Sequence, residues 1–121
     1  MDKLTDEQVE RRLSAALAQR AAVSAEKLIG GLLRTLDLTA DAADEFTFPA
    51  LESTARERIF GGQVIAQAII AADRTVEDEK KIHSLHSYFL RAGDETKPLH
   101  FRVHRDFDGR SISNRRVVVR Q

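Results

Sequence analysis

The sequence predicts an α+β domain in which a curved antiparallel sheet wraps around one mostly apolar helix. Three observations predict this arrangement. Residues 62–72 form a nearly continuous apolar run of helical length. Three segments with strand character follow it. The last two of these are joined through Asp108-Gly109, a dipeptide typical of hairpin turns.

The apolar run is the centre of this prediction. At 3.6 residues per turn, its polar side chains Gln63, Gln67 and Arg74 fall on one narrow stripe. A helix that is apolar around most of its circumference must be enclosed by other elements. Its many alanines would let a sheet approach closely.

Residues 1–23 predict a polar helical extension, and residues 24–121 predict the folded domain. Thr5 can cap the extension, with Gln8 as its reciprocal partner. Ser24 can start a second helix. Its apolar side chains recur at helical spacing and predict a wide buried face, formed by Leu28, Ile29, Leu32, Leu33 and Leu36.

The strands are predicted from alternation and from turn residues. Residues 37–44 favour a turn, residues 45–48 a short strand, and residues 50–59 a loop. Ile82–Leu90 has the length of a strand. Residues 99–107 alternate apolar and polar side chains, and residues 111–121 predict the return strand.

The hairpin between the last two strands has a predicted register. A three-residue loop of residues 107–109, with Gly109 in the left-handed conformation, would pair odd positions with odd positions. Val117 and Val119 would then share a face with the apolar residues of the preceding strand. The strand pattern continues to Gln121, which would leave an open sheet edge. We therefore expect a truncated domain that needs at least one further strand.

Composition excludes several classes of protein. The 121 residues carry 19 basic and 19 acidic side chains, so the basic excess of a nucleic-acid-binding protein is absent. There is no cysteine, and hence neither a disulfide nor a thiolate metal site. No apolar stretch approaches the roughly 20 residues of a membrane span. We expect a cytoplasmic protein without a cofactor.

Three motifs in residues 60–121 resemble the acyl-CoA thioesterase II family, whose proteins repeat a hotdog fold twice. The motifs are Phe60-Gly61-Gly62-Gln63-Val64-Ile65-Ala66-Gln67-Ala68, His83-Ser84-Leu85-His86-Ser87-Tyr88-Phe89-Leu90-Arg91, and Asp108-Gly109-Arg110-Ser111 with Arg115-Arg116-Val117. The resemblance covers roughly residues 24–121 and implies the N-terminal hotdog half. Ala92 departs from the proline that is typical of the family.

The resemblance implies hydrolysis of fatty acyl-CoA to a free fatty acid and CoA. In that family the acid that directs water, a hydroxyl residue and a glutamine come from the second repeat. This chain is therefore expected to need a second repeat or another hotdog chain, as a homo-oligomer or within one polypeptide, and to be inactive alone. The alternatives are a non-catalytic acyl-binding or assembly module, and a truncated product without a function of its own.

The candidate residues for binding the substrate lie at the start of the central helix. Thioester hydrolysis needs donors for a developing oxyanion, and free N–H groups at a helix N-terminus suit that task. Gly61 and Gly62 would let a carbonyl approach, or would only permit tight packing. Gln63 and Gln67 would line the acyl or pantetheine channel, or would form hydrogen bonds between repeats.

His83 is the candidate catalytic residue, because it matches the family motif; the alternative is a structural histidine. His83 and His86 lie three positions apart and so on opposite sides of a strand, and we expect no metal site. Arg115 and Arg116 are candidates for binding the phosphates of CoA, because arginine binds phosphate bidentately. The alternative for this basic cluster is a solvated or interface surface.

Overall fold

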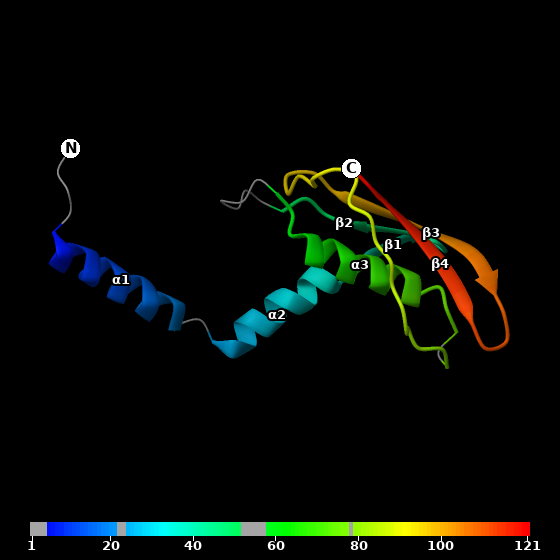
Figure 1. The fold of residues 1–121 in the computed structure, drawn as a ribbon, viewed down its shortest axis with the longest axis horizontal. Helices are drawn as coiled ribbons and strands as arrows, with labels where there is room; N and C mark the ends of the chain where they lie inside the picture. The colour runs from blue at the N-terminus through cyan, green and yellow to red at the C-terminus, as the bar shows by residue number, and fades with distance from the viewer. Residues whose placement is uncertain (1–4, 22–23, 52–57, 78) are drawn as a thin grey trace. The chain divides into compact units, whose positions relative to one another are not determined.

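The computed structural model describes residues 5–21, 24–51, 58–77 and 79–121 (Figure 1). The chain divides into two compact units, residues 1–34 and residues 35–121. This division lies C-terminal to the domain boundary that the sequence suggested at residue 24. The helices are α1 (Asp6–Ala21), α2 (Ala25–Leu36) and α3 (Gly61–Asp73), and the strands are β1 (Thr39–Ala42), β2 (Glu45–Phe48), β3 (Leu99–Asp108) and β4 (Ser113–Arg120).

The first unit contains α1 and most of α2, and both helices begin where the sequence predicted. The Thr5 N–H donates to Gln8 Oε1 at 3.0 Å, which is the reciprocal half of a capping box. The Lys27 N–H donates to Ser24 Oγ at 3.3 Å, so Ser24 caps α2. No helix in the described part of the chain is both long enough and apolar enough to cross a membrane.

The predicted buried face of α2 is wrong for this chain. Leu28, Ile29, Leu32 and Leu33 are 59–63% exposed, and α2 has no buried residue. The helical spacing of these residues predicted the helix correctly. Amphipathic spacing shows which side of a helix needs a partner, but it does not show that the same chain supplies one.

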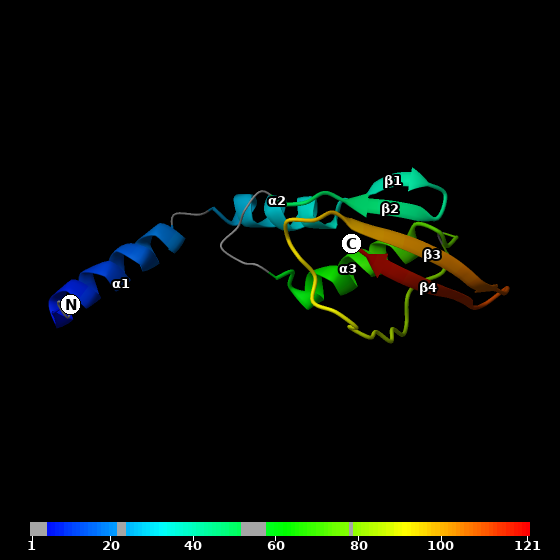
Figure 2. The ribbon, with the colours of Figure 1, turned by 90° about the horizontal axis from the view of Figure 1, so that it is seen from above.

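The second unit is built on a four-stranded antiparallel sheet in the order β1-β2-β3-β4 (Figure 2). The strand predicted at residues 45–48 is confirmed, and Phe46 lies opposite Phe101 of β3. The turn predicted for residues 37–44 is confirmed only at residues 43–44, because Thr39–Ala42 forms β1. The Thr-Ala-Asp-Ala sequence of β1 lacks apolar alternation, so pairing with β2 determines this strand.

One face of the sheet packs on α3. Leu99, Phe101 and Val103 alternate with exposed residues along β3 and point into the core. The helix was expected to be enclosed on most sides. Only Gln67 and Ala71 of α3 are fully buried, and the remaining apolar side chains are half-buried. The core also contains Leu38, Phe46 and Phe48, with Val64, Ala68, Ile70, Val117 and Val119 packed against it.

The register of the β3–β4 hairpin is confirmed, because Phe101 lies opposite Val119 and Val103 opposite Val117. The loop itself differs from the prediction. It spans residues 109–112, and none of the described glycines has a positive φ. A bulge between Arg105 and Phe107 absorbs the difference in length. Gly109 lets the Phe107 ring pack on the loop, since a Cβ atom there would lie 2.7 Å from that ring.

The strand predicted at Ile82–Leu90 is wrong for this chain. The segment is extended and runs beside α3, but it is not paired to any described strand (Figures 1 and 2). Its pattern predicted an extended conformation, but a strand also needs a neighbour. The loop predicted at residues 50–59 falls mostly outside the described residues, at 52–57.

Candidate functional site: the N-terminus of helix α3

Helix α3 begins at a pair of glycines without a side-chain cap. Phe60 occupies the N-cap position with φ −66° and ψ 124°, and its side chain cannot accept a hydrogen bond. The N–H of Gln63 donates to the Phe60 carbonyl at 3.0 Å. The N–H groups of Gly61 and Gly62 have no acceptor among the described residues. The positive end of the helix dipole therefore coincides with two free donors.

An aromatic ring lies close to each of the two glycines. A Cβ atom at Gly61 would lie 3.1 Å from Phe89 Cζ, and one at Gly62 would lie 2.5 Å from Phe60 Cε1. The glycines therefore permit tight packing, one of the two roles considered from the sequence. This packing does not exclude the other role, access for a carbonyl. The Phe60 ring is 70% exposed and does not enclose the start of the helix. The first turn of α3 contains no acidic residue that could activate water.

Gln67 is fully buried and bonds to the junction between α2 and β1. Its Nε2 donates to the Thr35 carbonyl at 2.7 Å, while Oε1 has no partner among the residues that the structure describes. Arg74, on the same stripe of α3, donates to the Leu38 carbonyl at 2.6 Å. Two side chains of α3 thus hold residues 35–38 in place. Gln63 is half-buried at the start of the helix and is the glutamine nearest to the free N–H groups.

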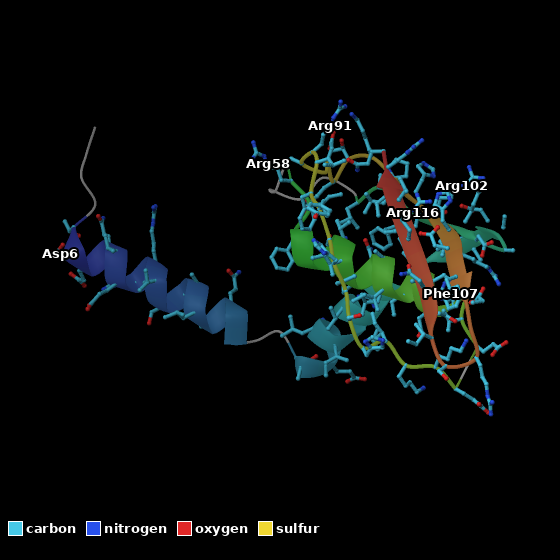
Figure 3. All side chains as sticks on the ribbon, turned by 45° about the vertical axis from the view of Figure 1, so that its right-hand side comes forward. Asp6, Arg58, Arg91, Arg102, Phe107 and Arg116 are labelled. Atoms are coloured by element: carbon cyan, nitrogen blue, oxygen red, sulfur yellow. The ribbon has the colours of Figure 1, made fainter. Side chains whose placement is uncertain are left out.

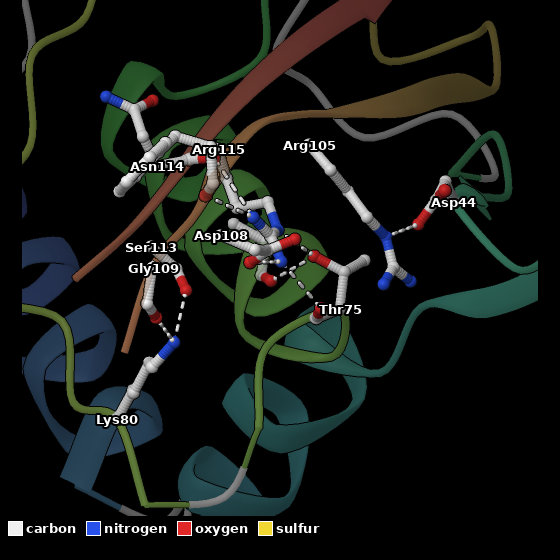
Figure 4. A network of polar contacts seen from close by, with 11 residues as sticks. Asp44, Thr75, Lys80, Arg105, Asp108, Gly109, Ser113, Asn114 and Arg115 are labelled. Atoms are coloured by element: carbon white, nitrogen blue, oxygen red, sulfur yellow. Dashed lines mark hydrogen bonds and ion pairs between the residues drawn. The ribbon is translucent and has the colours of Figure 1, made fainter. Parts of the chain in front are cut away.

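Arg115 holds the opposite end of α3 (Figure 4). Its side chain is only 6% exposed. Nε and Nη2 donate to the hydroxyl and the carbonyl of Thr75 at 2.8 and 3.0 Å, and Nη2 also donates to Asp108 Oδ1 at 2.7 Å. Nη1 donates to the carbonyls of Phe107 and Asn114. Every nitrogen of this guanidinium is engaged within the chain, so the residue joins the helix end to the hairpin.

The same network affects Asp108. The pKa of its carboxyl is held below the ordinary value of 3.8, because Arg115 donates a hydrogen bond to it and Ser113 donates a second. Lys80 lies beside this group. Its Nζ donates to the Gly109 carbonyl at 2.6 Å and to Ser113 Oγ at 2.8 Å.

Arg116 lies on the other face of the sheet from Arg115. It is opposite His104, and its guanidinium bonds Asp106 at 3.2 Å (Figure 3). A shallow cavity of about 300 Å³ on this outer face is lined by residues that include Arg102, His104 and Arg120. Since α3 covers the opposite face, Arg115 and Arg116 cannot bind one phosphate group together.

His83 is exposed near the start of the segment beside α3 and has no hydrogen-bond partner among the described residues. Phe89, six residues further on, contacts the N-terminus of the helix. Six extended residues span about 20 Å. The structure therefore separates His83 from the two glycines. His86 stacks on Tyr88 with ring centroids 4.7 Å apart, which places these two side chains on one side of the segment.

The residues predicted from the sequence thus form one site and several separate groups. Gly61, Gly62 and Gln63 lie together, whereas Arg115 is at the far end of the 13-residue helix, about 20 Å away. Sequence reasoning missed Phe89 as the neighbour of Gly61, and it missed the Thr75 and Lys80 contacts. Only the fold brings these residues together, because no sequence spacing relates them.

Solved structures with this architecture define the class of protein. The tesB protein of Mycobacterium avium subsp. paratuberculosis matches with a TM-score of 0.69 and 41% identity, over 76% of this chain and 37% of that one. The acyl-CoA thioesterase II TesB2 of Mycobacterium marinum matches with a TM-score of 0.66 and 36% identity, over 75% and 32%. The fold is therefore the α+β hotdog fold of these thioesterases.

The family follows from the sequence comparisons. Residues 50–121 match the model of the acyl-CoA thioesterase N-terminal domain, and the chain belongs to this family. Human acyl-coenzyme A thioesterase 8 is 46% identical over 65 residues, which are 54% of this chain. Acyl-CoA thioesterase 2 of Haemophilus influenzae is 41% identical over 56 residues, which are 46% of this chain. Each match spans 20% of the relative's length.

Proposed function

We propose that this chain is the first hotdog unit of an acyl-CoA thioesterase, which hydrolyses fatty acyl-CoA to a fatty acid and CoA. The observation that carries the proposal is the N-terminus of α3, where the N–H groups of Gly61 and Gly62 have no acceptor in the described part of the chain. Such donors suit the oxygen of a thioester carbonyl, whose negative charge grows as water attacks. The cytoplasmic location also stays a prediction.

The chain contributes scaffold and binding surface, and a second hotdog unit contributes the group that activates water. No carboxylate lies in the first turn of α3, and His83 is distant from it. General base catalysis requires a group within hydrogen-bond reach of the attacking water. The isolated chain should therefore bind acyl-CoA without turning it over. Its partner is a second repeat or another hotdog chain.

The test is a thioester hydrolysis assay on the purified chain, in which a thiol reagent detects CoA released from a long-chain acyl-CoA. We expect no turnover above buffer, together with saturable acyl-CoA binding in a calorimeter. Gln63→Ala should weaken that binding, whereas His83→Ala, at an exposed position away from the helix start, should leave it unchanged. Turnover that survives both substitutions would contradict the placement of any chemistry at these residues.

A non-catalytic assembly module is the second candidate function. The exposed apolar stripe of α2 and the exposed apolar segment at residues 82–90 favour it. A chain that binds no acyl-CoA but forms a defined complex with another hotdog chain in sedimentation would support the module and reject the enzyme unit.

A further inference from the structure

The outer face of the sheet, opposite α3, carries a row of cationic and titratable side chains. His100, Arg102 and His104 share this face of β3, because side chains on one face of a strand recur every two residues. On β4, Arg120 lies directly opposite His100. Arg116 lies directly opposite His104 (Figure 3). Residues in such pairs have Cβ atoms about 4.5–5.5 Å apart, so each histidine has an arginine as its direct neighbour on β4.

The acidic side chains on this face already have partners. Asp41 of β1 accepts a hydrogen bond from a threonine hydroxyl of β2 at 3.3 Å. Glu45 of β2 lies 3.5 Å from the guanidinium of Arg102, and Asp106 of β3 pairs with Arg116 at 3.2 Å. These three carboxylates balance the three arginines of the face. The face therefore carries no net formal charge while both histidines are neutral.

Protonation of the two histidines adds two positive charges that nothing on the face balances. In the ranges that the structure describes, His100, His104 and Arg120 make no hydrogen bond or ion pair. Histidine is the side chain that ordinarily gains its charge between about pH 8 and pH 5. Like charges placed directly opposite one another destabilise a sheet. A bound anion would remove this repulsion.

The geometry of the face suits an oxyanion. His100, Arg102 and Arg120 border the shallow cavity of about 300 Å³, and Val118, opposite Arg102, adds an apolar part to its lining. A guanidinium offers parallel N–H donors that match two oxygens of one phosphate or sulfate group. A protonated imidazole adds two N–H donors. The contact of Arg102 with Glu45 is a single one at 3.5 Å, which leaves most of its donors available.

We infer that this cavity binds a doubly charged oxyanion, carried by a small phosphorylated molecule, and that it does so when His100 and His104 are protonated. Arg102, Arg120 and His100 would hold the oxygens. The sheet separates this cavity from α3, so the inference goes beyond the proposed function. By linkage, the anion and the protons each tighten the binding of the other. Acidity and a phosphorylated molecule would thus act on this face together.

The test uses nuclear magnetic resonance to follow the ring signals of the four histidines from about pH 8 to pH 5. Titrations with and without sulfate are compared at equal ionic strength, because salt alone screens the repulsion. We expect the titration midpoints of His100 and His104 to rise by about 0.7 pH unit, which corresponds to roughly fivefold tighter sulfate binding per proton. His83 and His86, on the segment beside α3, are internal controls and should not shift.

Two exposed arginines of the hairpin give a matched pair of variants. Arg120→Gln removes a proposed ligand and should reduce the sulfate-induced rise by at least about half. Arg110→Gln removes the same charge at the hairpin tip and should keep the full rise. Equal rises in the two variants, a rise shared by all four histidines, or no rise at all would overturn the inference.

Glucose 6-phosphate identifies the source of the oxyanion. It should produce the same rise as sulfate at the same concentration, because the cavity is open to solvent and can admit a phosphate on a larger molecule. A rise with sulfate alone would limit the cavity to free inorganic ions and would overturn the assignment to a phosphorylated molecule. No measurement here involves acyl-CoA, so this inference and the proposed function can fail independently.

Discussion

The two ends of α3 are satisfied in opposite ways. At the C-terminal end, Arg115 bonds Thr75 twice and joins the helix to the hairpin through part-buried hydrogen bonds. At the N-terminal end, Phe60 provides no cap, and no residue that the structure describes accepts from the N–H groups of Gly61 and Gly62. The comparison shows where function can lie, because a group already bonded within the chain cannot also bind a substrate without losing those bonds.

The largest expected effect is at the bonded end. Arg115→Met removes the donors to Thr75 and Asp108 while keeping an apolar stem of similar length. We expect the free energy of unfolding to fall by about 2–3 kcal/mol, because two part-buried charge-assisted hydrogen bonds to Thr75 are lost together with the exposed ones to Asp108 and the hairpin carbonyls. Urea titration followed by circular dichroism measures the change.

Arg116→Met is the matched control for that variant. Its ion pair with Asp106 is exposed on the outer face, and such pairs contribute about 0–1 kcal/mol. Equal losses in the two variants would refute the distinction between a buried anchor and a surface ion pair.

At the N-terminal end of α3, a substitution should have a smaller effect of opposite sign on the free energy of unfolding. Phe60→Asp supplies the missing cap, because a carboxylate there can accept from the N–H groups of Gly62 and Gln63. Stability should rise by about 1 kcal/mol. The same carboxylate should weaken acyl-CoA binding, since it occupies the Gly62 N–H, one of the two donors proposed for the thioester. Phe60→Ala separates the loss of the ring from the gain of the cap. Unchanged binding in the Asp variant would remove the substrate from this end of the helix.

The smallest effect concerns pH. The pKa of Asp108 is lowered in the folded state by Arg115 and Ser113, so its contribution is present above the ordinary value of 3.8. That contribution is lost as the pH falls below 3.8 through the folded-state pKa. Urea midpoints measured from pH 6 downward should fall less steeply for Asp108→Asn than for the wild type. Identical slopes would show that the anchor does not depend on this charge.

Much of the second unit was predictable from residues alone. The short strand at residues 45–48, helix α3 and the pairing of Phe101 with Val119 all follow from local alternation and one turn. β1 was not predictable, because its small polar residues take their conformation from β2. The segment at residues 82–90 was predicted as a strand because its pattern is correct, but pairing depends on a neighbour that the described chain does not provide.

The site was predictable only in part. The Gly-Gly-Gln motif placed Gly61, Gly62 and Gln63 at one helix end, as the structure has them. Arg115 was a candidate phosphate ligand in the sequence analysis. The sequence does not show whether an arginine donates to carbonyls of its own chain or is exposed to solvent. The surroundings of Gln67 were also not predictable from the sequence. Its burial and its bond to Thr35 depend on where α2 meets β1.

Two hydrogen bonds join helix α3 and its C-cap to residues 35–38, which lead into the sheet. Gln67 and Arg74 bond the Thr35 and Leu38 carbonyls at 2.7 and 2.6 Å, so the strands begin from a fixed anchorage. A partner protein that binds the exposed leucines of α2 would place its load on these two hydrogen bonds first. Because Gln67 lies in α3 and Arg74 caps its C-terminus, the load would pass to this helix before it reached β1.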